Sequence, residues 1–175
     1  MRTGQFVILV LFAALWTSSC EKENPVEKQE ERIDAYIKAK MNKNPALKLS
    51  DENSVRYLYE PDDTEINVAA GDSVYFYYAG TLVADTLKYF DTNIKELAEA
   101  LRLNTESRTF EPVGVIVGNN NLLPGLAIGL NMVHLGDNGE IIFNSDMGYG
   151  KTGNGVVPPY SPLIFKIIIV KIKKN

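Results

Sequence analysis

The segment SDMGYGKTGNGVVPPYSPLIFKI, residues 145–167, joins a glycine-rich loop and a proline pair to a run of β-forming residues. The triplet Gly150-Lys151-Thr152 also ends the phosphate-binding loop motif, which requires a glycine at the position of Ser145 and a helix after the triplet. Gly153, Gly155 and the two prolines disfavour a helix there. The segment therefore predicts a surface loop that leads into a strand, and it argues against a nucleotide site.

Strands account for much of the remaining pattern. Alternating β-forming residues bounded by turn residues predict five of them, at 54–60, 71–82, 113–118, 139–144 and 162–172. Apolar residues at helical spacing predict two short helices, at 93–104 and 123–133, and Asn93 with Glu96 forms a capping pattern at the start of the first. Because these elements show no regular βαβ alternation, the fold class that we expect is α+β, with an antiparallel sheet packed on a helix.

The N-terminus has the pattern of an export signal. The apolar run Phe6–Trp16 is too short for a permanent membrane-spanning helix, and it ends at Thr17-Ser18-Ser19-Cys20. This ending resembles the lipobox of bacterial lipoproteins, although Thr17 stands where leucine is usual. The resemblance implies that residues 1–19 are a lipoprotein signal peptide, and that a lipidated Cys20 anchors an extracytoplasmic protein to a bacterial membrane. The alternative is a plain secretory signal followed by a stray cysteine.

A short extension separates Cys20 from the predicted sheet. Residues 20–31 are charged and almost free of apolar side chains, so we expect a solvated tether. From Arg32, apolar residues at helical spacing predict a helix that ends before Pro45, within an extension that spans 32–51. We expect its apolar face to pack on the domain, and a contact surface for a second copy is the alternative.

The residue sets used by the common catalytic chemistries are missing from the sequence. Cys20 is the only cysteine and His134 the only histidine, so zinc and thiol chemistry lack ligands and nucleophiles. No nucleophile motif lies near His134, which we expect to find at the surface. The net charge of −4 argues against nucleic acid as a partner. We therefore expect no metal or other cofactor.

Four segments together resemble the signature segments of the FKBP-type peptidyl-prolyl cis-trans isomerases. In chain order they are GDSVYFYYAGTL (71–82), YFDTN (89–93), VIVGNNNLLPGLAIGL (115–130) and the opening segment, 145–167. The resemblance covers roughly residues 52–175 and implies a strongly curved antiparallel sheet wrapped on a short helix, with the glycine-rich loop above an apolar pocket. It also implies isomerisation of X-Pro bonds in proline-containing unfolded or exported proteins, and macrolides as inhibitors.

The same resemblance assigns roles to individual residues. Asp91 and Tyr149 are the implied catalytic residues: Asp91 lies near the twisting carbonyl and Tyr149 donates a hydrogen bond from its hydroxyl. The backbone N–H of Leu123 is implied to bind the substrate chain. The implied substrate-binding side chains are Tyr78, Phe90, Val113, Leu122, Leu123, Leu126, Val156, Val157 and Phe165.

Several positions depart from the family pattern. Leu126 replaces the usual tryptophan at the pocket floor, Val113 replaces a common aromatic, and Asn154 stands where the loop often has histidine. These changes predict a wider pocket and a low activity. The alternative function is therefore a catalytically weak binding or chaperone module of the cell envelope. The chain is also longer than the minimal family domain near residues 93–110, and this insertion forms either a decoration or an added wall for protein substrates.

Overall fold

The computed structural model of the chain describes residues 24–61, 66–84, 88–103, 105–106, 108–118 and 121–175. Its strands are β1 (Lys48–Glu52), β2 (Val55–Tyr59), β3 (Ser73–Leu82), β4 (Lys88–Thr92), β5 (Val113–Ile116), β6 (Asn138–Phe143) and β7 (Leu163–Lys173). Its helices are α1 (Pro25–Lys43), α2 (Lys95–Ala100), α3 (Pro124–Gly129) and the 3₁₀ helix η1 (Ser145–Met147).

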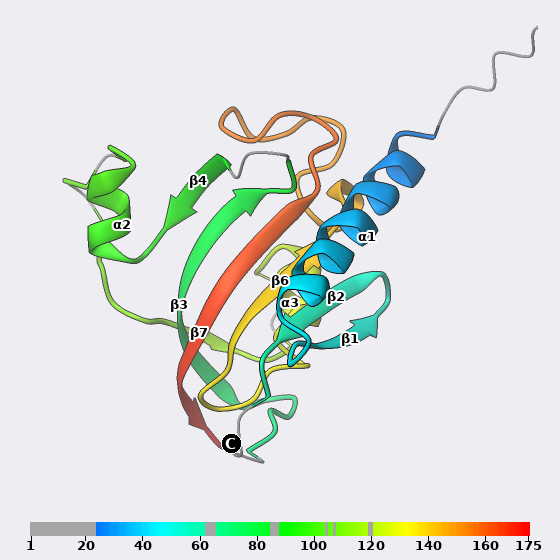
Figure 1. Cartoon of the computed structure of the whole chain (residues 1–175). Helices are drawn as coiled ribbons and strands as arrows, with labels where there is room; N and C mark the ends of the chain where they lie inside the picture. The colour runs from blue at the N-terminus through cyan, green and yellow to red at the C-terminus, as the bar shows by residue number, and fades with distance from the viewer. Residues whose placement is uncertain (1–23, 62–65, 85–87, 104, 107, 119–120) are drawn as a thin grey trace, which may run out of the picture.

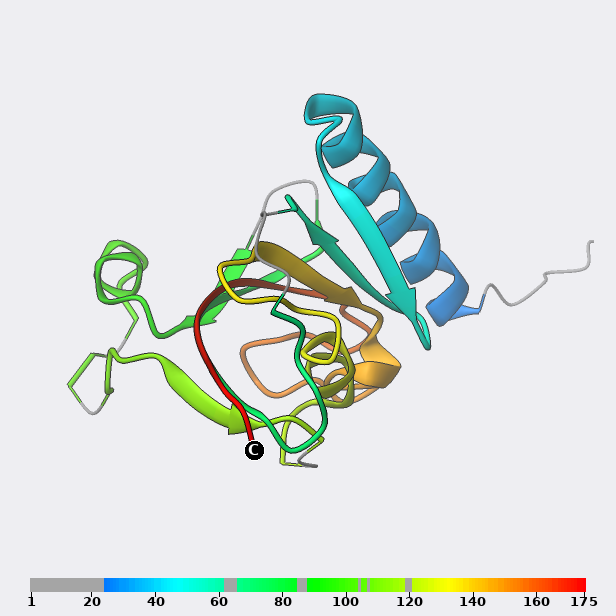
Figure 2. The ribbon, with the colours of Figure 1, turned by 90° about the horizontal axis from the view of Figure 1, so that it is seen from below.

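One antiparallel, seven-stranded sheet organises the fold. The strand order is β1-β2-β6-β7-β3-β4, and β5 pairs with β3 beside this path. Figure 1 shows the curved sheet with α1 crossing in front of it, and Figure 2 shows α3 enclosed by the curl of the sheet while α1 lies outside. The expected α+β class with an antiparallel sheet on a short helix is confirmed.

Neighbouring residues of β6 and β7 point into two separate cores, because successive side chains of a strand face opposite sides of the sheet. Ile141 and Phe165 belong to the larger core, which includes Leu126 of α3. Their neighbours Ile142 and Ile164 belong to a smaller core that is covered by Ile33 of α1. The apolar face of α1 therefore packs on the domain, as we expect from the sequence.

The five expected strands are all present, and two further strands were missed. β1 has the sequence KLSDE and lies within the extension at 32–51, while β4 has the sequence KYFDT. Neither has the apolar alternation of a half-buried strand. Both are end strands of the sheet order, so pairing with a single neighbour holds them in place.

The solvated tether expected at 20–31 is wrong from Pro25 onward, because α1 begins there. The side chain of Asn24 accepts a hydrogen bond from the first turn, and Pro25 occupies an early helical position that suits proline. Gln29 is only 2% exposed, and its side-chain oxygen accepts the backbone N–H of Ser145 at 2.8 Å. Polar contacts with the domain thus hold a stretch that has few apolar residues.

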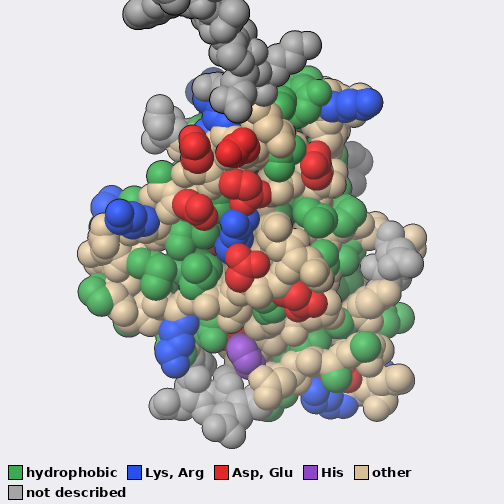
Figure 3. Space-filling view, turned by 90° about the vertical axis from the view of Figure 1, so that its right-hand side faces the viewer, with side chains coloured by type: hydrophobic (Ala, Val, Ile, Leu, Met, Phe, Trp, Pro, Cys, Tyr) green, Lys and Arg blue, Asp and Glu red, His purple; other side chains and the backbone are tan. Residues whose placement is uncertain are grey.

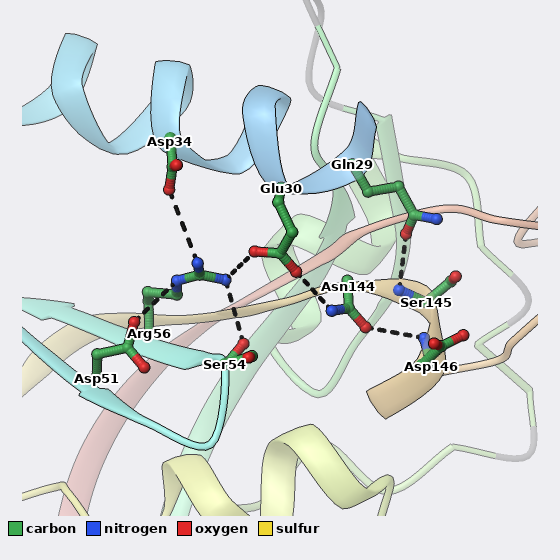
Figure 4. A network of polar contacts seen from close by, with 9 residues as sticks. All are labelled: Gln29, Glu30, Asp34, Asp51, Ser54, Arg56, Asn144, Ser145 and Asp146. Atoms are coloured by element: carbon green, nitrogen blue, oxygen red, sulfur yellow. Dashed lines mark hydrogen bonds and ion pairs between the residues drawn. The ribbon is translucent and has the colours of Figure 1, made fainter. Parts of the chain in front are cut away.

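Charged side chains continue this attachment, as Figure 4 shows. Glu30 of α1 accepts hydrogen bonds from Arg56 of β2 and from Asn144, which precedes η1. Arg56 also pairs with Asp51 of β1, at 3.1 Å from Nε to Oδ2, and lies 3.8 Å from Asp34. One guanidinium therefore joins α1, β1 and β2. No helix within the described residues is long and apolar enough to span a bilayer.

The helix expected at 93–104 is shorter, and its predicted cap is wrong. α2 begins at Lys95 after Ile94, and no side chain caps it. The Asn93 side chain is used elsewhere: its oxygen accepts the backbone N–H of Tyr78 at 2.6 Å, and its amide donates to the backbone oxygens of Phe76 and Glu111. Asn93 therefore fastens β4 and the end of the insertion to β3.

The C-terminal residues are held by one buried carboxylate. Asp72 accepts a hydrogen bond from Lys174 Nζ at 2.9 Å, and from the backbone N–H groups of Ala69 and Asn175 at 2.9 and 3.1 Å. These donors, the lysine foremost, lower the pKa of the Asp72 carboxyl. The ionised carboxylate therefore stabilises the end of β7 against the turn before β3.

We expect the thermal stability contributed by Asp72 to be lost in acid. Because folding lowers its pKa, the contribution is complete above the unfolded value of about 3.9 and disappears as the pH falls through the lower folded value. Melting temperatures of the parent and of Asp72→Asn should differ near neutral pH and converge at low pH. A difference that stays constant over the whole range would contradict this role.

Candidate active site

A cavity of about 440 Å³ opens between α3, the 148–160 loop and the strands around β3. This volume suits a small ligand or a segment of peptide. Nine of the eleven expected site residues line it: Tyr78, Phe90, Asp91, Val113, Leu122, Leu123, Leu126, Tyr149 and Phe165. Segments far apart in the sequence therefore meet around one largely apolar space.

Phe165 of β7 stands at the centre of the aromatic wall. Its ring lies 5.8 Å from that of Phe90 in an edge-to-face arrangement, 6.0 Å from Tyr78 and 5.9 Å from Phe143, with which it stacks. Phe90 in turn meets Tyr149 edge to face at 6.3 Å. Each ring restricts its neighbours, so the packing of the rings against one another holds the wall in place.

Gly80 explains how Phe90 reaches this wall. A Cβ atom at position 80 would lie 2.6 Å from the Phe90 ring, so only glycine leaves room for the ring across the β3–β4 pair. The register of the two strands shifts between Gly80 and Thr81, and this irregularity accompanies the close approach. The Tyr-x-Gly pattern of 78–80 thus places Tyr78 and Phe90 on the same side of the cavity.

Asp91 is the one carboxylate among the described residues that line the cavity. Its Oδ2 accepts a hydrogen bond from the Tyr78 hydroxyl at 2.7 Å, and its Oδ1 accepts one from Arg108. Arg108 also donates to the backbone oxygen of Thr92 at 3.2 Å, which fixes the guanidinium against β4. Two donors therefore hold the Asp91 carboxylate in one orientation at the edge of an apolar space.

Both tyrosine hydroxyls of the site stay protonated at neutral pH. Burial raises the pKa of Tyr78, and its hydrogen bond to Asp91 raises this pKa further. Burial also raises the pKa of Tyr149, and the negative charge of Asp91 adds to the effect. Each hydroxyl is therefore a hydrogen-bond donor, as the resemblance implies for Tyr149.

The glycine-rich loop closes over the site by hydrogen bonds within itself. The N–H of Gly153 donates to the Tyr149 oxygen at 3.1 Å, and that of Tyr160 donates to the Gly150 oxygen at 3.0 Å. Gly153 has a φ of +67°, and a Cβ there would lie 2.2 Å from the Val157 oxygen. Only glycine fits this turn, so Gly153 determines the shape of the loop.

Val156 and Val157 do not line the cavity, contrary to expectation. The Val156 side chain is 68% exposed, and Val157 is buried in the larger core beneath the loop. The Val157 N–H donates to the Asn154 side chain at 2.9 Å, which turns the valine inward. This valine therefore anchors the loop in the core, where it forms no part of the pocket wall.

The model of the FKBP-type peptidyl-prolyl cis-trans isomerase family matches residues 64–170. The chain belongs to this family. Human peptidyl-prolyl cis-trans isomerase FKBP9 is 30% identical over 127 residues, which are 73% of this chain and 19% of that protein. Human FKBP14 is 27% identical over 124 residues, which are 71% of this chain and 53% of that protein. The chain thus matches about a fifth to a half of the length of these relatives.

Two solved structures have the same fold. FkpA from Escherichia coli has a TM-score of 0.58 at 21% identity, covering 85% of this chain and 61% of that chain. The N-terminal domain of FKBP42 from Arabidopsis thaliana has a TM-score of 0.58 at 17% identity, covering 73% of this chain and 93% of that chain. The FKBP-like fold implied by the sequence motifs is confirmed.

The structure adds four residues to this FKBP site. Phe76, Asn121 and Pro124 line the cavity beside the expected residues. Their neighbours in the motifs were identified, so their place in the sequence was a usable signal. Arg108 gave no signal, because only the path of the insertion brings it to Asp91. The described residues of the insertion at 93–110 do not line the cavity, but through Arg108 the insertion fixes the Asp91 carboxylate.

His134 lies apart from the FKBP pocket and is only partly exposed. Its Nδ1 is 3.2 Å from the buried carboxylate of Asp137, and its ring packs against Tyr59. The expectation of a surface residue is therefore only partly met. Among the residues described, no three His, Cys, Asp or Glu side chains are grouped so that they could hold a metal ion.

Proposed function

We propose that the chain catalyses cis-trans isomerisation of X-Pro bonds in exported proteins and so assists their folding. The observation that carries this proposal is the apolar, aromatic-walled cavity with Asp91, Tyr78 and Tyr149 at its polar side. Family membership supports the reaction class. Proline, whose ring is apolar and whose amide lacks an N–H, suits a space of this kind.

The reaction requires no broken bond. Resonance holds an X-Pro amide planar, with a rotational barrier of about 18–20 kcal/mol, and a catalyst need only bind the twisted amide more tightly than the planar forms. Twisting removes resonance and reduces the carbonyl dipole. An apolar wall favours that less polar form because it replaces the water that stabilises the planar amide. Phe90 and Phe165 supply this wall.

The polar side of the cavity discriminates between the planar and twisted amides. As resonance is lost, the carbonyl carbon becomes more electron-poor, so a fixed carboxylate beside it stabilises the twisted state. Asp91 supplies that carboxylate, and Tyr78 and Arg108 prevent it from turning away. Tyr149, which stays protonated, donates a hydrogen bond to the substrate backbone.

The cellular setting is also part of the proposal. The export signal in the sequence supports lipidation at Cys20 and an extracytoplasmic domain held at a bacterial membrane. Cys20 and the signal at 1–19 lie outside the described residues.

We expect Cys20→Ser to shift the protein from the membrane fraction to the soluble fraction of the cell envelope. Unchanged membrane association of that variant would argue against the lipid anchor.

A protease-coupled assay on X-Pro peptides tests the proposed reaction. Residues 21–175, which contain every described helix and strand, should accelerate isomerisation over buffer. Asp91→Ala should lower kcat/KM about tenfold, corresponding to about 1.4 kcal/mol of lost transition-state stabilisation. Tyr149→Phe should lower it less, because it removes one hydrogen bond worth about 1 kcal/mol.

Glu99→Lys is the matched control for these variants. It changes an exposed charge on α2, away from the cavity lining, and should leave kcat/KM unchanged. A folded parent that is no faster than buffer would overturn the proposed catalysis and favour the binding or chaperone module. Binding of an unfolded protein without turnover would then define that second function.

A further inference from the structure

β1 lies at one end of the described sheet and presents an open edge. It pairs with β2 on one side, and no other described strand pairs with it. Four of its five residues are exposed: Lys48, Leu49, Asp51 and Glu52. An open edge offers a row of backbone hydrogen-bond donors and acceptors to a further strand. The side chains of β1 determine which strand can pair with this open edge.

The charges of β1 are arranged to complement those of a second, antiparallel copy. When two copies pair about Ser50, Lys48 of each strand lies opposite Glu52 of the other, which gives two cross-strand ion pairs. Pairing centred on Asp51 would place two aspartates opposite each other, and pairing centred on Leu49 would leave Glu52 outside the ladder. The Ser50-centred register is therefore the one that pairs opposite charges twice.

Lys48 and Glu52 are available for such pairs. Both side chains are exposed, and neither has a charged partner within the described part of the chain. They lie on the opposite face of β1 from Leu49 and Asp51, which alternate with them along the strand. Asp51 already forms an ion pair with Arg56. The charged side chains of β1 that can pair with a second copy are therefore Lys48 and Glu52.

The exposed apolar side chain of β1, Leu49, also favours association with a second copy. Leu49 is 43% exposed and borders a groove of about 400 Å³ between α1 and β1. Figure 3 views the molecule from the side of α1 and β1, where apolar and acidic side chains gather at the surface. In the Ser50-centred pair each Leu49 lies directly opposite Asp51 of the other copy, whose carboxylate is held by Arg56, and the two Leu49 side chains are diagonal neighbours across the twofold axis.

We propose that two copies of the chain associate through β1, forming a twofold-symmetric dimer with one continuous sheet. The contact is self-complementary, as a twofold interface requires. It closes an open sheet edge in each copy, pairs four charges and covers both Leu49 side chains. Because each strand contributes only five residues, the dimer is weak and depends on concentration.

A charge-reversal experiment tests this dimer by sedimentation equilibrium over a concentration series. Parent residues 21–175 should form a dimer that weakens with added salt. Lys48→Glu and Glu52→Lys each turn both cross-strand attractions into repulsions, so each should weaken dimerisation about tenfold or more. An equimolar mixture of the two variants restores opposite charges in both pairs and should recover dimerisation as a heterodimer.

Controls separate this interface from other effects. Circular dichroism should show both variants folded, since the two side chains are exposed, and their isomerase rates should match the parent. The same reversal at Glu99 on α2 should leave the dimer intact. A parent that remains monomeric, a dimer unaffected by either reversal, or variants that stay monomeric when mixed would each overturn the β1 interface. The first two results leave the proposed isomerase activity untouched.

Discussion

Phe165→Ala should lower the free energy of unfolding by about 3–5 kcal/mol, the usual cost of removing a buried phenylalanine from a core. The ring is only 5% exposed and contacts three other aromatic rings, so little of the space can be refilled. The same change removes the central wall of the proposed proline site, and kcat/KM should fall by at least about tenfold. Denaturant unfolding and the X-Pro peptide assay measure the two effects separately.

Ile169→Ala is the matched control for stability. Ile169 lies four residues further along β7, points into the same core and is buried, but it does not line the cavity. We expect a loss of about 2–5 kcal/mol in stability and, below the melting transition, no loss of kcat/KM. If both variants lost stability but kept the parental kcat/KM, Phe165 would be a core residue without a role in the site.

Phe165 and Ile169 show how much of the site can be predicted from the sequence. Alternation along 162–172 predicts a strand with one buried face, and it treats Phe165 and Ile169 alike. The family motifs then assign Phe165 to the pocket, where the structure places it. The motifs also assign Tyr78, Asp91 and Tyr149 to the pocket, and the structure places all three in the cavity lining.

Two of the failures have the same cause, which is that long-range polar contacts leave no periodic pattern in the sequence. The polar residues Gln29 and Glu30 predict a tether where α1 begins, yet both side chains are held by partners far along the chain. Arg108 could not be assigned to Asp91, because the fold of an insertion decides where its side chains reach. Val157 was misplaced because the turn at Gly153 directs it into the core.

Edge strands were missed for a different physical reason. β1 and β4 each need only one neighbour, and exposed edges tolerate charged residues that central strands do not. Alternation of β-forming residues therefore detects β2, β3, β6 and β7, which bury side chains, and it also detects β5, whose valines and isoleucine favour a strand although most of them are exposed. It overlooks β1 and β4, which are short and carry charged residues. The charges of β1 do not predict a strand from the sequence. Once the structure places β1 at the edge of the sheet, the same charges indicate how a second copy could pair with it.

Leu126→Trp should strengthen binding of a macrolide ligand about tenfold if the chain binds such ligands through this pocket. Leu126 is 7% exposed and lies at the start of α3, with its side chain in the cavity lining. An indole there would bury about 50–60 Å² more apolar ligand surface, worth about 1.4 kcal/mol at about 25 cal/mol per Å². Titration calorimetry on the parent and the variant measures the change.

The same substitution has a cost in stability that the structure also predicts. Extra volume in a packed core costs about 1–3 kcal/mol, unless the added ring can occupy the cavity. Ile128→Trp adds comparable bulk on the same helix outside the cavity lining, and should cost stability without changing ligand affinity. A folded Leu126→Trp variant with parental affinity would show that ligands do not reach this residue. The low activity expected from its replacement of tryptophan would then need another cause.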